Sequence, residues 1–257
     1  MQAFCQHLVI LVLLTLSASL MAQKSVTTFG LSFKPMIAGS LLNEGDPLSI
    51  ENNIEYRTDK AYGYSAGMVI RYGFTDLLSI ETGLGYTQRN FDMSVLDITN
   101  NYEFQQTFGV VSYEVPIQGL VYIQLSKQIF MDAAFGVVFD MFPSDVAVFA
   151  DDGRLVMEGR RKSWLQGALT ANLGWEWRTK SKGAIYLGAT YHRTFGDAYG
   201  FLMEYDYDPS NINSKSTTMI NTVNGNYLTI DLRYFFHTNA EEQLKKKNER
   251  KQKRSRR

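Results

Sequence analysis

The sequence predicts an all-β protein, an eight-stranded antiparallel up-and-down β-barrel that spans a membrane. Three observations predict it. Apolar and polar residues alternate with a period of two, the connections between alternating segments are short and long in turn, and aromatic residues gather at both ends of the segments. Such alternation is typical of a strand with one apolar and one polar face. In a membrane barrel the apolar face contacts lipid and the polar face lines the interior.

Eight alternating segments are each long enough to cross a bilayer as a tilted strand, which takes about 9–11 residues. They are expected near residues 27–38, 61–74, 77–90, 107–125, 129–141, 163–178, 184–196 and 226–236. The closing segment, YLTIDLRYFF, shows the pattern clearly. Its apolar face carries Leu228, Ile230, Leu232, Tyr234 and Phe236, and its polar face carries Thr229, Asp231 and Arg233.

The connections predict how the barrel sits in the membrane. Residues 75–76, 126–128 and 179–183 read as tight turns, whereas roughly 39–60, 91–106, 142–162 and 197–225 are long loops. Outer-membrane barrels have short periplasmic turns and long extracellular loops. An even number of strands then places both termini in the periplasm.

Two aromatic belts support the membrane assignment, because aromatic rings anchor strands at the two membrane interfaces. Near the short turns lie Tyr72, Phe74, Phe130, Trp175, Trp177, Tyr186, Tyr234 and Phe236; near the long loops lie Tyr62, Tyr64, Tyr86, Phe139, Trp164, Tyr191 and Phe195. A soluble barrel or sandwich would share the alternation but would bury its apolar face. The belts, the long loops and the N-terminal segment favour the membrane barrel over that alternative.

Residues 1–22 resemble a secretory signal peptide. The apolar run from Leu8 to Leu16 is too short to span a bilayer, and small residues follow it up to Ala22. The only cysteine is Cys5. Cleavage after Ala22 would leave no cysteine for a disulfide, a thiolate metal site or a cysteine nucleophile.

The polar faces carry charged residues that are expected to point into the barrel. An eight-stranded barrel is just wide enough for side chains to fill it, so these charges are expected to form a packed network of ion pairs; a permeation path is the alternative. The predicted network contains Lys34, Arg71, Glu81, Glu114, Asp132, Glu176, Asp231 and Arg233. Asp140 has the same inward parity.

The sequence predicts no catalytic, cofactor-binding or metal-binding residues. His192 could be drawn with Ser163 or Asp197 as a hydrolase-like group near the long loops, but no spacing supports this and a hydrogen-bonded interior histidine is favoured. The alternating acids Glu204, Asp206 and Asp208 lack the spacing and glycine of a calcium loop and read as an acidic solvated loop.

The chain has 26 basic and 26 acidic side chains, but they are unevenly distributed. Residues 245–257 hold nine of the basic ones and one Glu, so the rest of the chain has 17 basic and 25 acidic side chains, a net charge of −8. Residues 238–257 have almost no apolar side chains and read as a disordered periplasmic tail. The cations predicted to bind an anionic partner are Lys245, Lys246, Lys247, Arg250, Lys251, Lys253, Arg254, Arg256 and Arg257. A solvated end without a partner is the alternative.

The strand sequences FGLSFKPMIAG, YGYSAGMVIRYGF, LSIETGLGYTQR, AIYLGATYHRTFG and YLTIDLRYFF, with the MAQ exit of the leader, resemble the PorT-like family of small outer-membrane barrels of the Bacteroidetes. The resemblance runs from the leader down to Phe236. It implies the barrel fold in the outer membrane and a part in a pathway that secretes proteins across that membrane. The basic tail departs from the family pattern, because it moves the usual C-terminal assembly signal inside the chain.

These observations together predict a barrel of residues 23–237 in the bacterial outer membrane, acting as a non-enzymatic envelope scaffold or as an accessory to protein secretion. Its expected partners are outer-membrane lipid and either the cell wall or a periplasmic secretion component. No cofactor is expected, and nucleic acid is excluded by the compartment. An outer-leaflet enzyme and a narrow pore are the alternative functions.

Overall fold

The computed structural model describes residues 26–37, 48–75, 77–179, 181–208, 210–211 and 215–238. The predicted signal peptide and the cationic residues of the predicted tail lie outside these ranges. Every pairing between strands in the described part is antiparallel. No described helix is long and apolar enough to cross a membrane.

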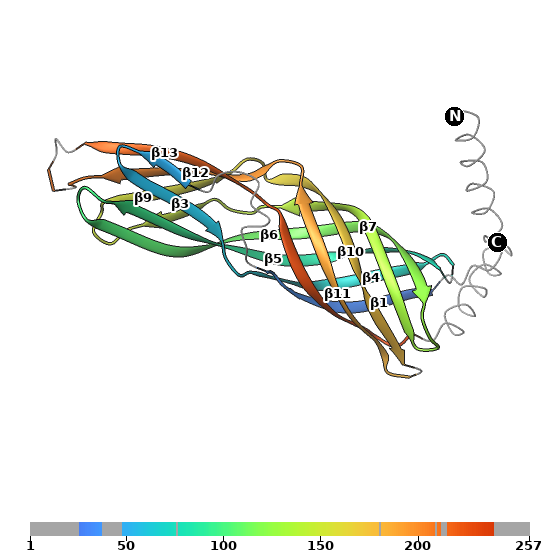
Figure 1. Cartoon of the computed structure of the whole chain (residues 1–257). Helices are drawn as coiled ribbons and strands as arrows, with labels where there is room; N and C mark the ends of the chain where they lie inside the picture. Colours follow the sequence, from blue (N-terminus) through green and yellow to red (C-terminus); the bar gives the residue numbers. More distant parts are fainter. Residues whose placement is uncertain are drawn as a thin grey trace, which may run out of the picture.

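Eight strands close into a ring, which confirms the predicted barrel (Figure 1). Around the ring each strand pairs with the next, and the last pairs back with the first. In that order they are β1 (Val26–Pro35), β4 (Tyr64–Gly73), β5 (Leu78–Asp97), β6 (Tyr102–Gln124), β7 (Ile129–Met141), β10 (Leu165–Thr179), β11 (Gly183–Thr194) and β14 (Tyr227–Phe235). The predicted segments correspond to these strands one for one, although β5 and β6 extend further than expected.

The outer face of the ring is apolar and exposed. Leu31 of β1, Leu173 of β10 and Leu232 of β14 are each about half exposed, at 51, 51 and 47%. Leaving such a surface in water is unfavourable, because burial of apolar area stabilises by about 25 cal/mol per Å². The band therefore faces the hydrocarbon of a bilayer, and the polar residues between these positions face inward.

Most of the expected belt aromatics lie on that outer face, including Trp175, Trp177, Trp164 and Phe195. Tyr186 does not: it is fully buried inside the barrel. Position near a short turn suggested a belt residue, but the alternation along β11 turns Tyr186 inward, together with its neighbours in register, Glu176 and Arg233.

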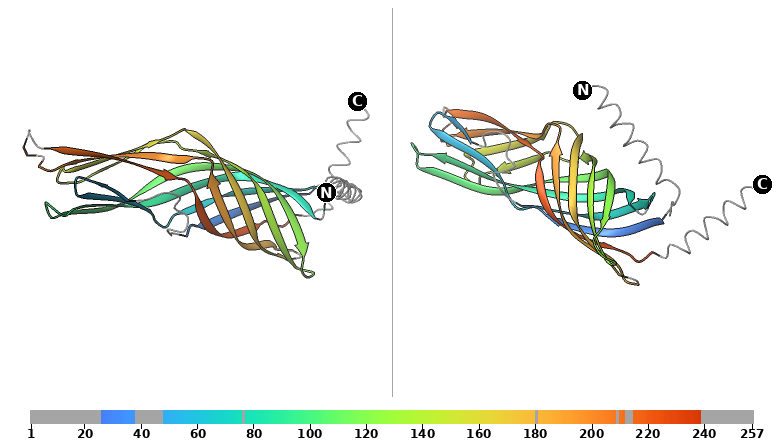
Figure 2. Two further views of the ribbon diagram at one scale, coloured as in Figure 1. Left: turned by 45° about the horizontal axis from the view of Figure 1, so that its top comes forward. Right: turned by 45° about the vertical axis from the view of Figure 1, so that its right-hand side comes forward.

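The sequence pattern predicted that the long connections are loops, but much of their length is strand. They contain six further strands, β2 (Leu48–Glu51), β3 (Ile54–Lys60), β8 (Val146–Phe149), β9 (Leu155–Arg161), β12 (Asp197–Asp206) and β13 (Ser216–Asn224). β2 and β3 extend the sheet along β5, and the other four form a second sheet in the order β13-β12-β9-β8. Figure 2 shows this part projecting well beyond the barrel. β8 and β9 form a hairpin whose turn contains Asp152 and Gly153, and Gly153 has a φ of 74°.

The two projecting layers enclose a hydrophobic core of their own, and we call this unit the outer sandwich. Phe201 and Met203 of β12 pack with Phe91 and Met93 of β5 and with Met157 of β9. Three of these five side chains have no exposed surface, and the others are at most 3% exposed. The projecting connections are therefore a folded layer held by apolar packing on the far side of the membrane from the short turns.

Candidate functional site

The inward-facing charges of the barrel are buried and meet one another. Arg71, Glu81, Asp132, Glu176 and Arg233 are each at most 5% exposed. Charges taken out of water are tolerated when they are paired and hydrogen-bonded.

Seven of the eight residues of the predicted network form one connected group, which we call the central cluster. Arg71 of β4 hydrogen-bonds Glu81 at 2.9 Å, forms an ion pair with Glu176, and lies 3.5 Å from Asp132. Arg233 of β14 lies 2.6 Å from Glu81 and 2.5 Å from Asp231. The seven members are Lys34, Arg71, Glu81, Asp132, Glu176, Asp231 and Arg233.

Neutral side chains support one end of this cluster. Thr190 and Thr229 donate to the carboxylate of Asp231 at 2.7 and 2.6 Å, and the Tyr186 hydroxyl donates a hydrogen bond to Asn172 Oδ1 at 2.7 Å. The Tyr186 ring has room because Gly174 and Gly188 face each other across β10 and β11. A Cβ atom on either glycine would lie 2.3 or 2.2 Å from the Tyr186 hydroxyl oxygen.

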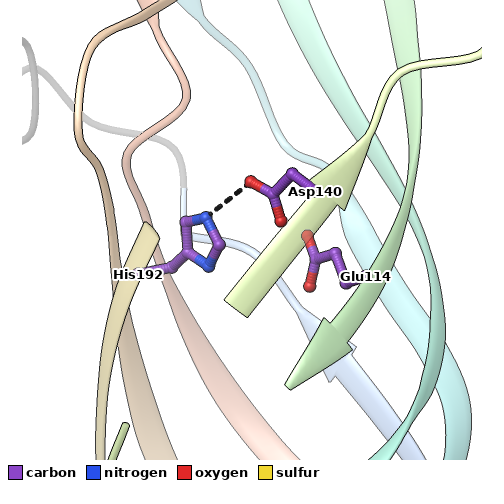
Figure 3. A group of neighbouring side chains, drawn as sticks. All are labelled: Glu114, Asp140 and His192. Carbon is purple, nitrogen blue, oxygen red and sulfur yellow. Dashed lines mark hydrogen bonds and ion pairs between the residues drawn. The ribbon is translucent and has the colours of Figure 1, made fainter. Parts of the chain in front are cut away.

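Glu114 is the one predicted member that lies elsewhere. It belongs to a second group nearer the outer sandwich, the outer cluster, made of Arg89, Glu114, Asp140, His192 and Tyr227. Arg89 Nη2 donates to Glu114 and to Asp140, both at 3.1 Å, and the Tyr227 hydroxyl donates to Glu114 at 2.8 Å. His192 Nε2 lies 2.9 Å from Asp140 Oδ2, as Figure 3 shows, and its ring stacks on Tyr227 with centroids 4.3 Å apart.

The outer cluster has the residue types of a metal site, because one ligand atom each of Glu114, Asp140 and His192 lie within 4.8 Å of one another. However, the Arg89 guanidinium is hydrogen-bonded to both carboxylates and so supplies the cation that they require. The five residues therefore form a charge-paired polar layer inside the barrel.

The structure does not bring His192 together with the partners considered for catalysis. Its imidazole is 1% exposed and contacts Asp140 and Tyr227. Among the described residues, neither Ser163 nor Asp197 is a hydrogen-bond partner of His192.

The three acids of the expected solvated loop are also not gathered into a site. Glu204 and Asp206 are part of β12, and Asp208 lies just beyond it and accepts hydrogen bonds from Ser210. The acidic segment is thus largely a strand of the outer sandwich.

Two arginines that sequence analysis did not single out are central to these groups. Arg89 holds the outer cluster together, and Arg178 bonds Glu176 at 2.5 Å. Both positions share the parity of an expected inward residue on the same strand, Glu81 for Arg89 and Glu176 for Arg178. Both lie within the predicted segments 77–90 and 163–178, so the period of two along those segments would have found them.

A cavity of about 510 Å³ lies at the short-turn end of the barrel, and we call it the mouth cavity. Its walls include Tyr122, Phe130 and Phe235, and its charged lining residues are Arg71, Glu176 and Arg178. Phe130 was expected in the aromatic belt, but it lines this cavity with its ring 4.0 Å from the Arg178 guanidinium. Because short turns are periplasmic in such barrels, the cavity opens toward the periplasm.

In the outer sandwich, two buried tyrosines act as hydrogen-bond donors. The Tyr199 hydroxyl donates to the carbonyl of Ser144 at 2.7 Å, and the Tyr205 hydroxyl donates to Asp97 at 3.1 Å. Burial raises the pKa of each tyrosine to about 12. Both hydroxyls therefore stay protonated at neutral pH and hold the connections of the sandwich in place.

Comparison with solved structures agrees with this architecture. The chain is similar to the outer membrane protein OprG from Pseudomonas aeruginosa, with a TM-score of 0.51 and 13% sequence identity over 84% of this chain and 99% of that one. The translocator domain of the autotransporter NalP from Neisseria meningitidis also aligns, with a TM-score of 0.34 and 13% identity over 91% of this chain and 95% of that one. No family model and no curated protein matches the sequence.

At 13% identity, the likeness to OprG shows the fold. The exposed apolar band of the ring independently indicates a membrane protein, because such a band requires a bilayer. The chain is an outer-membrane β-barrel protein, and its location is the bacterial outer membrane.

Proposed function

We propose that this barrel is a non-enzymatic scaffold of the envelope or an accessory component of a protein secretion system, and that its basic tail contacts an anionic periplasmic partner. The observation that carries the proposal is the buried, charge-paired interior. A barrel that is closed across its middle by paired charges offers its surfaces and its tail for function.

The filled interior favours a scaffold over a narrow pore. A path for ions would have to pass Arg71, Glu81 and Arg233, which are at most 5% exposed, and both arginines are bonded to Glu81. It would then meet the outer cluster and the hydrophobic core of the outer sandwich. Opening such a path would separate buried ion pairs, which costs about 3–5 kcal/mol for each partner left unpaired.

The interior also favours a scaffold over an outer-leaflet enzyme. His192, the histidine considered for catalysis, is buried and engaged with Asp140 and Tyr227. A general base must reach the proton that it removes from a substrate. A substrate would have to displace the outer sandwich to reach this imidazole.

The tail supports contact with an anionic partner. The last 13 residues carry nine Lys or Arg and one Glu, and the chain enters this segment on the periplasmic side, after β14. Exposed charges act over about 8 Å at physiological salt. Binding through this segment should therefore weaken as salt is added.

The test compares the full chain with a tail-neutral variant in which the nine Lys and Arg of residues 245–257 are replaced by Gln, so that chain length is kept. Detergent-solubilised protein is crosslinked to a periplasmic extract and recovered by an affinity tag. Partners recovered with the full chain at low salt should be lost with added salt and absent from the tail-neutral variant. Equal recovery by both proteins would show that the tail is only a solvated end.

A further inference from the structure

The mouth cavity has the size of a ligand site, since such sites in proteins occupy about 300–1,000 Å³. It is built from the ends of several strands: Thr28 of β1, Tyr122 of β6, Phe130 of β7, Arg178 of β10 and Phe235 of β14 all line it. These residues converge only because the ring is closed.

Among the described side chains, the cavity and its rim carry more positive than negative charge. Lys127 and Lys182 are exposed in the turns beside the opening, and Arg178 is partly exposed within it. Among the described residues, the one acid of the cavity is Glu176, whose side chain is 3% exposed and pairs with both Arg71 and Arg178. A concave surface with low-dielectric walls concentrates such a potential and attracts anions.

Arg178 is arranged to receive a carboxylate. Its guanidinium lies 4.0 Å from the centroid of the Phe130 ring and 4.6 Å from that of the Tyr122 ring. Cation–π contacts with these two rings hold the guanidinium in place. Its Nε is bonded to Glu176, while neither Nη nitrogen makes a hydrogen bond to a described residue. The Nη nitrogens remain as paired donors, the geometry that binds a carboxylate.

From these observations we propose that the mouth cavity is a docking site for an acidic segment of a periplasmic polypeptide, with one carboxylate on Arg178 and an apolar side chain against Phe130 and Phe235. The inference deepens the proposed function, because it rests on a periplasmic partner and names its chemistry. The tail and the cavity then act on the same partner. The tail supplies long-range attraction, and the cavity selects the segment.

The observations favour a polypeptide over the other candidates. The chain's own tail has nine cations and would be repelled by a positive cavity. Cell-wall polymer carries carboxylates but few large apolar side chains to fill the aromatic wall. A peptide with alternating acidic and apolar side chains matches both the charge and the wall.

The test measures binding of a short fluorescein-labelled peptide of alternating Glu and Phe by fluorescence anisotropy, with the full chain in detergent micelles. The tail-neutral variant serves as the background, so that the tail makes no contribution. In that background Arg178→Gln removes the guanidinium, and Thr28→Trp fills the cavity without changing its charge. Each should weaken binding about tenfold or more, a loss of about 1.4 kcal/mol. The matched control is Arg160→Gln, an exposed arginine of the outer sandwich, which should have no effect.

Heat-modifiable migration on gels shows that each variant is folded before binding is measured. A peptide with Gln in place of Glu should bind weakly, and so should one with Ser in place of Phe. Unchanged binding in both Arg178→Gln and Thr28→Trp would overturn the inference.

Further outcomes separate this inference from the proposal for the tail. If the full chain binds the peptide and the tail-neutral variant does not, the cavity is not a site and the tail proposal stands. If the two proteins bind equally and Arg178→Gln weakens both, the cavity inference stands and the tail has no part. Binding to isolated cell wall can be measured by co-sedimentation. If Arg178→Gln weakens that binding as strongly as it weakens peptide binding, the choice of a polypeptide is contradicted.

Discussion

Arg233 Nη1 lies 2.6 Å from Glu81 Oε1 across the barrel interior, although their strands, β14 and β5, are separated in the ring by β1 and β4. The two residues are 152 positions apart in the chain. Their ion pair can form only after the ring has closed, so it reports on the completed barrel.

Replacing Arg233 by Glu should destabilise the barrel. The new carboxylate would lie beside Glu81 and Asp231 in a buried place, and loss of one partner from a buried ion pair costs about 3–5 kcal/mol. Urea unfolding in detergent micelles, followed by tryptophan fluorescence, measures the change. Arg233→Lys keeps the charge and should cost less. Equal stability of the wild type and Arg233→Glu would mean that this interior is not held by ion pairing.

The purified protein should show no stable ohmic conductance in planar bilayers, because the charges of the central cluster are buried and paired, and an eight-stranded barrel is just wide enough for side chains to fill it. The measurement is the current at fixed voltage after insertion is verified by protease protection. Steady single-channel steps would favour the pore alternative, above all if Arg71→Ala enlarged them.

Phe201→Ala should loosen the outer sandwich and leave the barrel intact. Phe201 has no exposed surface and packs on Phe108 and Phe91, with ring centroids 5.2 and 6.1 Å away. Deleting a buried aromatic ring costs about 3–5 kcal/mol. Protease should then cut the outer sandwich faster while heat-modifiable migration persists. Phe149→Ala, at a site 64% exposed in β8, is the matched control and should change neither. Loss of barrel folding in Phe201→Ala would show that the two layers fold as one unit.

The tip of the β5–β6 hairpin should become less stable against local unfolding in acid. Burial raises the pKa of Asp97, but hydrogen bonds from Asn100, Tyr205 and the backbone N–H of Thr99 outweigh it, so the folded-state pKa is lowered. The stabilisation is fully present above the unfolded-state pKa of about 3.9 and is lost as the pH falls through the folded-state value. Hydrogen exchange of the hairpin between neutral and acidic pH measures it. Asp97→Asn should remove the pH dependence; an unchanged acid response in that variant would assign it to other groups.

A small epitope inserted between Asp152 and Gly153 should be accessible to antibody on intact cells, because this turn joins β8 and β9 in the outer sandwich, away from the short turns. An epitope after Arg257 should become accessible only when the outer membrane is permeabilised. The reverse labelling would invert the topology and place the mouth cavity outside.

The eight barrel strands and the inward direction of their charges follow from local sequence. A residue's side of a strand depends only on its parity, and each strand crosses the membrane with one face in lipid. Arg71, Glu176 and Arg233 could therefore be placed inside from sequence alone. Arg89 and Arg178 obey the same rule and lie within the predicted segments 77–90 and 163–178, so parity places them inside as well.

Only the tertiary structure decided which charges meet, and that the long connections are folded. Parity gives a side but not a height or a neighbour, so the separation of Glu114 from the central cluster depends on the stagger of strands around the closed ring. The outer sandwich escaped prediction for a related reason. Its strands bury apolar residues between two layers outside the membrane. The alternation of apolar and polar residues has the same period there as in the barrel. The layer that covers each apolar face comes from a distant part of the chain, so the local pattern does not reveal it.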